Sequence, residues 1–212
     1  MKETERIAGG LQQLNRSAVQ SAGSGDYAGA LALFQQALAF EEQLGFEVHV
    51  AETLMNIATT NLLLGDHPAA LEAVERAMEL FSAQRRTADL RSAALLRGTI
   101  LLRSGQYAAA ARELEACLRQ SPPEERAAIY AQAAAALAKL DQQYRAQEYL
   151  GRALADYERM GDRVAATACL RQRAVLFKAA GRKDLAVRDL QRCATLAGQR
   201  GDALADYERL ES

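Results

Sequence analysis

The residues of this sequence that could carry out chemistry are few, and their spacing fits no catalytic or metal-binding pattern. The two histidines, His49 and His67, are not part of a His-Glu-x-x-His motif, which would place two imidazoles on one helix face to bind zinc. No Gly-x-Ser-x-Gly motif and no glycine-rich phosphate loop is present. We therefore expect no catalytic residue, no metal site and no cofactor, and we expect the protein not to be an enzyme.

The three cysteines are better explained as packing residues than as reactive groups. Cys117, Cys169 and Cys193 are odd in number and show no Cys-x-x-Cys spacing, which fits reduced thiols better than a disulfide framework. A reactive thiol needs exposure and nearby positive charge. Cys117 and Cys193 instead occupy positions at which similar segments of the chain have alanine, so we expect both thiols to be buried.

The charge and hydropathy of the chain exclude several classes of partner. Its 212 residues carry 26 basic and 27 acidic side chains, a net charge of −1, and no basic block, so nucleic-acid binding is not indicated. No apolar run approaches the roughly 20 residues that a membrane-spanning helix needs. The polar start of the chain does not resemble a signal peptide. We expect a cytoplasmic protein without nucleic-acid or membrane partners.

A repeated turn organises the chain and therefore positions all of these side chains. Alanine, leucine, glutamate, glutamine and arginine dominate the composition, which favours helix. A short turn segment recurs at intervals of 40, 40, 36 and 40 residues. Its five copies start at Gly25, Gly65, Gly105, Asp141 and Gly181. Such self-similarity is the signature of a repeat architecture, in which each unit packs on the next.

Columns of small residues recur in phase with these turns. Five residues after each turn start there is an alanine: Ala30, Ala70, Ala110, Ala146 and Ala186. Seven residues before each turn start there is also a small residue: Ala18, Ala58, Gly98, Ala134 and Ala174. Small side chains allow neighbouring helices to approach closely. Each repeat is therefore predicted to be two antiparallel helices joined at the turn.

These columns resemble the tetratricopeptide repeat, which has a small residue in its first helix, a Gly-x-Tyr turn, and alanines in its second helix. The resemblance covers nearly the whole chain. The 40-residue period resembles the subclass found in Leu-Gly-Asn repeat adaptors, kinesin light chains and helical sensor domains of bacterial regulators. The resemblance implies an all-α, right-handed superhelical solenoid of five antiparallel helix pairs, followed by a short C-terminal helix.

The period also predicts the domain organisation. We expect a single domain over residues 1–212. Its five repeats are predicted approximately at 8–44, 45–86, 87–121, 122–160 and 161–200. Residues 202–212 are predicted to form a capping helix, since they could supply only part of a further first helix.

In this family the first helices of successive repeats line a concave groove that binds peptides, and the resemblance implies the same arrangement here. The predicted ligand-binding residues are Met55, Asn56, Thr59, Leu62, Leu95, Thr99, Leu102, Arg103, Gln132, Lys139, Arg171 and Lys178. The same count also places six further residues on this face: Asn15, Val19, Glu52, Ala135, Gln172 and Val175. The middle of the predicted groove is apolar, and its later part is basic, which would suit a partner that carries carboxylates.

The absence of a catalytic pattern leaves three hypotheses for the function. The first is a non-enzymatic protein–protein interaction scaffold, which binds a peptide or a partner helix in the groove. The second is a self-associating structural module, such as a homodimer formed through exposed repeat surfaces. The third is a regulatory domain of a bacterial regulator that senses a ligand or a peptide.

Overall fold

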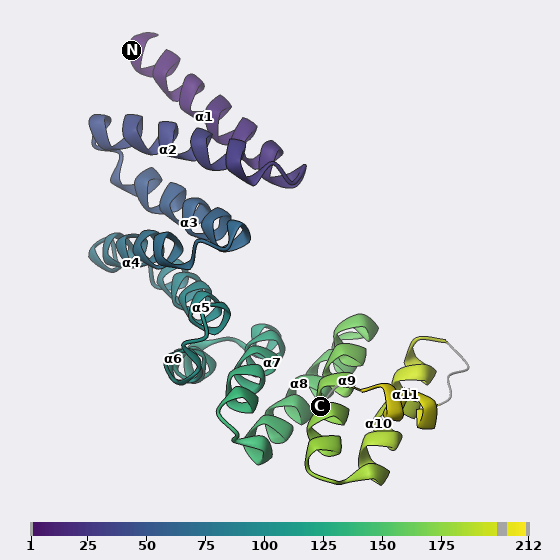
Figure 1. Cartoon of the computed structure of the whole chain (residues 1–212). Coiled ribbons are helices and arrows are strands. Elements are labelled where there is room, and N and C mark those ends of the chain that lie inside the picture. Colours follow the sequence, from purple (N-terminus) through teal and green to yellow (C-terminus); the bar gives the residue numbers. More distant parts are fainter. Residues whose placement is uncertain (1, 199–202, 211–212) are drawn as a thin grey trace. The chain divides into compact units, whose positions relative to one another are not determined.

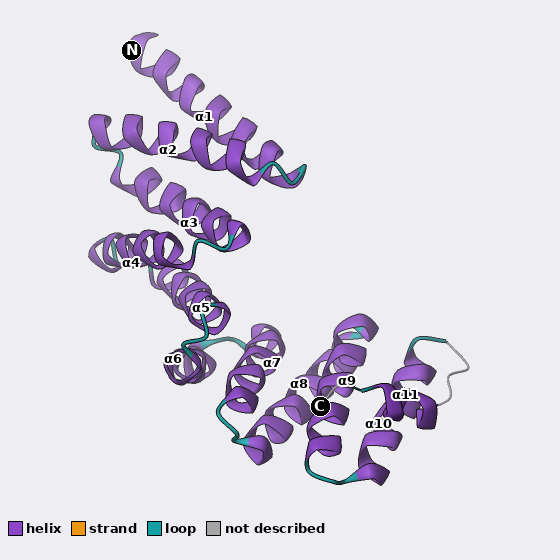
Figure 2. Cartoon of the chain, viewed as in Figure 1, coloured by secondary structure: helices purple, strands orange, loops and turns teal. Residues whose placement is uncertain are grey.

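The protein is helical throughout the part that the structure describes. The computed structural model describes residues 2–198 and 203–210, and Figures 1 and 2 show that the secondary structure of these residues is entirely helical. The helices are α1 (Lys2–Gly23), α2 (Tyr27–Leu44), α3 (Glu47–Leu64), α4 (His67–Ala83), α5 (Thr87–Arg103), α6 (Tyr107–Gln120), α7 (Pro123–Lys139), α8 (Gln143–Met160), α9 (Arg163–Ala179), α10 (Lys183–Leu196) and α11 (Ala203–Arg209). The prediction of helix pairs followed by a short C-terminal helix is confirmed. Residues 1, 199–202 and 211–212, which include both ends of the predicted cap, lie outside the described residues.

The chain forms two compact units, which meet between Gly105 and Gln106. Unit 1 contains α1 to α5, and unit 2 contains α6 to α11. The boundary falls within the third predicted repeat, 87–121, between its two helices. The single domain over residues 1–212 therefore stays a prediction. None of the described helices is long and apolar enough to cross a membrane.

The turns that define the period share one backbone conformation. All five turn starts have a positive φ, including the fourth copy, in which an aspartate replaces glycine: Gly25 (85°), Gly65 (81°), Gly105 (80°), Asp141 (57°) and Gly181 (69°). A left-handed residue ends a helix by allowing the following N–H groups to bond back to its last carbonyls. The sequence pattern therefore located each of these turns correctly.

Aspartate side chains mark the start of several helices. Asp26, Asp66 and Asp162 each accept a hydrogen bond from the backbone N–H three residues later, at 2.9, 3.1 and 3.0 Å. Such a cap satisfies one of the N–H groups that a helix start leaves without a partner. In α4 a proline follows in the first turn, where its missing N–H has no cost.

The predicted columns of small residues form the contacts between helices. The second-helix alanines are completely buried in both units: Ala30, Ala70, Ala110, Ala146 and Ala186. The first-helix column is buried as well: Ala18, Ala58, Gly98, Ala134 and Ala174. A larger side chain at these positions would force helices apart, at a typical cost of about 1–3 kcal/mol.

Ion pairs connect second helices within each unit. In unit 1, Arg76 of α4 donates to Glu42 of α2 at 2.8 Å. In unit 2, Arg192 of α10 donates to Glu158 of α8 at 2.5 Å. Both pairs are largely exposed, so each contributes only about 0–1 kcal/mol. They fix the alignment of neighbouring repeats more than they stabilise the fold.

Two acidic residues lie buried inside the helix packing of the described residues, and neither was expected from the sequence. In unit 1, Glu41 is fully buried and accepts a hydrogen bond from Asn15 at 3.3 Å. In unit 2, Arg173 of α9 donates two hydrogen bonds to the buried Asp189 of α10, at 2.7 and 2.8 Å. These hydrogen bonds raise the pKa of the Arg173 guanidinium. A bidentate pair of this kind fixes the rotation of α10 against α9.

Candidate functional site

Unit 2 contains a cavity between its first helices α7 and α9, closed on one side by α8. Its volume is about 430 Å³. The lining residues are Ala134, Ala135, Ala138, Lys139, Gln143, Leu150, Gln172, Val175, Leu176 and Ala179. The cavity exists because α7 presents alanines where a larger side chain would fill the space. Its size and its mainly apolar lining suit one or two apolar side chains of a ligand.

This cavity brings together several residues that the sequence predicted on the groove face. Ala135 and Lys139 come from α7, and Gln172 and Val175 come from α9. Lys139 and Gln172 are exposed, whereas Ala135 and Val175 are half-buried. The cavity therefore combines an apolar wall with an ammonium group and an amide that can bind polar groups of a ligand.

In unit 1 the predicted residues of α3 differ in how accessible they are. Asn56 and Thr59 are exposed, and Met55 is half-buried against the core. Leu62 is only 9% exposed and belongs to the hydrophobic core of the unit. The Thr59 hydroxyl donates to the Met55 carbonyl at 2.9 Å. Of the predicted residues on this helix, the exposed ones are therefore polar, Asn56 and Thr59.

The predicted residues of α5 also differ in their accessibility to solvent. Leu95, Thr99 and Leu102 are half-buried, and Arg103 is exposed. The Thr99 hydroxyl donates to the Leu95 carbonyl at 2.9 Å. Helix α5 lies beside α3 as well as α4. Unit 1 thus presents Met55 and Leu95, with the polar residues near them, on adjacent first helices.

The remaining predicted residues of unit 2 do not gather in the cavity between α7 and α9. Gln132 is half-buried on α7. The Lys178 ammonium donates to the backbone carbonyls of Tyr207 and Leu210 at 3.1 and 2.7 Å, so it holds α11 in place. Arg171 lines a different cavity, between α9, α10 and α11. The sequence placed these side chains on the correct helices but could not show which cavity each one faces.

The side chains considered for chemistry have structural surroundings. All three cysteines are buried, and burial raises the pKa of the Cys169 thiol to about 11, so this thiol is protonated at neutral pH. His49 is exposed beside the Phe46 ring, with ring centroids 5.8 Å apart. His67 is half-buried at the start of α4. Within residues 2–198 and 203–210, no group of histidine, cysteine or acidic residues could hold a metal ion.

Comparison with known proteins agrees with a fold of repeated helix pairs. The tetratricopeptide repeat family model matches residues 13–83, which comprise the second half of α1 and all of α2, α3 and α4. Solved structures with the same helical-repeat fold match over most of the chain. This chain therefore has the fold of tetratricopeptide-type helical repeat proteins, and its residues 13–83 match the model of that family. No curated protein matches its sequence.

Three solved structures illustrate the repeat fold of this tetratricopeptide-type chain. The quorum sensor NprR from B. thuringiensis, in its apo form, has a TM-score of 0.79 at 14% identity, over 95% of this chain and 57% of that one. A putative kinesin light chain of Podospora anserina, with nearly identical repeats, has a TM-score of 0.75 at 18% identity, over 89% and 94%. A Rap protein complexed with competence and sporulation factor has a TM-score of 0.71 at 16% identity, over 92% and 56%.

These identities are low, so the three likenesses show the repeat fold alone. The tetratricopeptide-type chain spans little more than half the length of NprR and of the Rap protein. By contrast, it matches nearly the whole length of the kinesin light chain structure. The predicted likeness to kinesin light chains is thus confirmed at the level of the fold.

Proposed function

We propose that this protein is a non-enzymatic interaction scaffold, which binds an apolar segment of a partner protein between the first helices α7 and α9. The observation that carries the proposal is the cavity of about 430 Å³ between these helices. Four residues predicted on the groove face line it: Ala135, Lys139, Gln172 and Val175. In a repeat protein the stacked units create an extended surface that is available for binding.

Burial of apolar side chains provides the affinity in this proposal. An apolar side chain of the partner enters between Ala135 and Val175, where its transfer from water yields about 1.5–3 kcal/mol. The exposed Lys139 ammonium pairs with a carboxylate of the partner, and the Gln172 amide bonds to its backbone. The polar contacts fix the register of the segment more than they add affinity.

The solved structures support the same class of function. They include the apo form of a quorum sensor and a Rap protein complexed with competence and sporulation factor, and the second of these supports a binding role for the fold. Unit 1 would contribute through the accessible residues of α3 and α5, among them Met55, Asn56 and Leu95.

A peptide-display selection tests the proposal. A library of random peptides is selected on the full chain and on a Val175→Glu variant, which places a carboxylate against the apolar wall of the cavity. We expect the selected peptides to combine apolar and acidic residues and to lose about tenfold or more in affinity for Val175→Glu. A matched control is Tyr144→Glu, which introduces the same charge at an exposed position of α8 outside the cavity.

The control separates groove binding from a general effect of negative charge. Peptides that bind in the cavity keep their affinity for Tyr144→Glu and lose it for Val175→Glu. Equal binding to the wild-type chain and to both variants would overturn the proposal. The circular dichroism spectrum and the melting temperature of each variant confirm that it is folded.

A further inference from the structure

Helix α11 covers only part of the surface that follows the last helix pair. In unit 2 the pair α7 and α8 is followed by α9, which has 17 residues, whereas the pair α9 and α10 is followed by α11, which has seven. Ala203 of α11 packs with Ala174 and Leu190, beside the C-terminal half of α9. Val164, near the start of α9, is 83% exposed. The N-terminal half of α9 therefore presents an uncovered surface.

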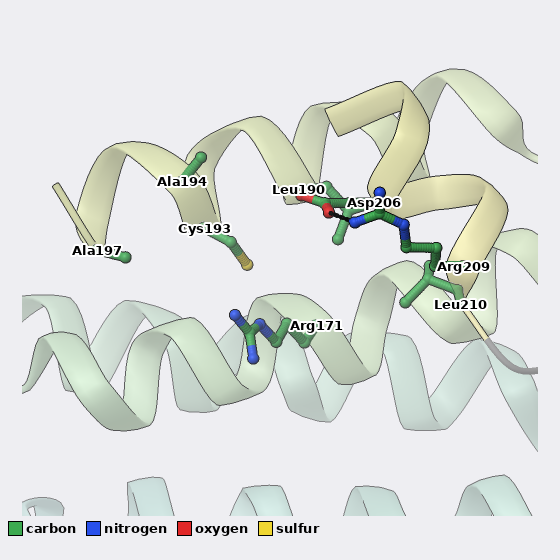
Figure 3. A pocket seen from close by; sticks show the side chains of 8 residues that line it. All are labelled: Arg171, Leu190, Cys193, Ala194, Ala197, Asp206, Arg209 and Leu210. Atoms are coloured by element: carbon green, nitrogen blue, oxygen red, sulfur yellow. Dashed lines mark ion pairs between the residues drawn. The ribbon is translucent and has the colours of Figure 1, made fainter. Parts of the chain in front are cut away.

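Two cavities lie along this uncovered surface and adjoin at Arg171 and Ala197. The first, drawn in Figure 3, has a volume of about 280 Å³. It is lined by Arg171, Leu190, Cys193, Ala194, Ala197, Asp206, Arg209 and Leu210. The second has a volume of about 380 Å³. It is lined by Arg163, Val164, Thr167, Ala168, Arg171, Leu196 and Ala197. None of these residues lines the cavity between α7 and α9.

The charge of these two cavities is positive. Arg163, Arg171 and Arg209 line them, and Asp206 is the one acidic residue among the lining residues. Asp206 already pairs with Arg209, at 3.8 Å, as Figure 3 shows. The ion pairs found in the described part of unit 2 do not include Arg171. A ligand with a carboxylate would therefore be attracted to the Arg171 guanidinium.

The Cys193 thiol, which lies near Arg171, does not carry a negative charge that would neutralise the Arg171 guanidinium. The Cys193 thiol and the Arg171 guanidinium lie on facing walls of the first cavity (Figure 3). Burial raises the pKa of the Cys193 thiol, and the nearby Arg171 charge lowers it by less. The thiol is thus neutral at physiological pH, and the positive charge of Arg171 is not balanced by a thiolate.

We propose that this surface, which we call the α9–α10 end surface, binds an amphipathic helix of a partner protein. The apolar face of that helix packs on Val164, Ala168 and Leu196, and one of its glutamate or aspartate side chains pairs with Arg171. A helix fits because the preceding pair, α7 and α8, is followed by a helix, α9, which packs on α8. This binding is independent of the proposed function, since the two sites share no residue.

Charge reversal at Arg171 tests this inference directly. The probe is a displayed library of helix-forming peptides of 17 residues, the length of α9, in which acidic and apolar positions vary. Binding of the selected peptides is measured by fluorescence anisotropy on the full chain and on Arg171→Glu, Arg171→Lys and Val164→Asp. All three variants change exposed side chains, so folding should be retained, and circular dichroism checks this.

We expect a class of acidic peptides whose affinity falls about tenfold or more on Arg171→Glu and on Val164→Asp, and changes little on Arg171→Lys. The affinity of this class should be unchanged by Val175→Glu, which alters the cavity between α7 and α9. The inference is overturned if no peptide of the library binds in a way that depends on Arg171 and Val164. Loss of binding on Val175→Glu alone would instead assign the peptides to the cavity of the proposed function.

Discussion

At the scale of single residues, Arg173 and Asp189 form a buried, bidentate ion pair in unit 2. Its two hydrogen bonds of 2.7 and 2.8 Å join α9 to α10, and both side chains are mostly shielded from water. Breaking such a pair leaves a charge buried without a partner. The columns of small residues did not indicate this pair, although the period places Arg97 and Glu113 of the third repeat at the same two positions.

We predict that Asp189→Ala lowers the free energy of unfolding by about 3–5 kcal/mol, since it leaves the Arg173 guanidinium buried without its carboxylate. The matched control is Asp156→Ala, which removes a carboxylate that pairs with the exposed Arg159 and should cost about 0–1 kcal/mol. Urea unfolding followed by circular dichroism measures both changes. Equal effects of the two variants would show that the buried pair has no special role.

The thiol of Cys169 provides a second test at this scale. Burial raises its pKa from an ordinary value near 9 to about 11, so between these two values the unfolded chain loses the thiol proton while the folded chain retains it. The free energy of unfolding should therefore fall as pH rises from about 9 to 11, with no contribution from this group below pH 9. The wild-type chain and a Cys169→Ala variant are compared by urea unfolding across this range. The same pH dependence in both chains would contradict the prediction.

At the scale of the helices and turns, the fourth turn shows how the fold tolerates an imperfect repeat. Asp141 has a positive φ of 57°, in the left-handed region. Glycine adopts this conformation at the other four turn starts, whereas an aspartate is strained by it. Its exposed side chain accepts a hydrogen bond from Gln143 at 3.1 Å. The turn therefore keeps its geometry, although the residue type is unfavourable.

We predict that Asp141→Gly stabilises the protein by about 0.5–1 kcal/mol, because relief of the backbone strain exceeds the added entropy of the unfolded chain. The matched control is Gly181→Ala, at the same position of the next turn, where φ is 69° and no atom would crowd the added Cβ. That change should destabilise by about 1 kcal/mol. Thermal unfolding measures both variants, and destabilisation by Asp141→Gly would refute the strain argument.

The sequence predicted the helix pairs well because small residues and turns return at a fixed period. Ala146 and Asp141 occupy the places that the period assigns them, one buried and the other left-handed. The position of α11 did not follow the period. A 40-residue spacing gives Ala203 the same repeat position as Arg163, which is exposed at the start of α9. In the structure, Ala203 is instead buried against Ala174. This position depends on tertiary contacts, such as the bonds from Lys178 to α11, which no local pattern encodes.

At the scale of the whole molecule, the candidate binding surfaces are set within each unit. The sequence predicted one groove that runs along all the first helices. In the structure, Lys139 and Val175 share a cavity in unit 2, whereas Leu62 belongs to the core of unit 1. The period specifies the helix on which a residue lies. It does not specify whether neighbouring side chains leave that residue accessible, because this depends on the sizes of residues on other helices.

Mapping of chemical shifts tests whether a partner segment binds between α7 and α9. The isotope-labelled full chain is titrated with a peptide selected for loss of binding to Val175→Glu, and the backbone amide resonances are followed by NMR spectroscopy. We predict that the largest changes lie around Ala135, Lys139, Gln172 and Val175. Changes confined to other helices, with these four amides unaffected at saturation, would contradict it.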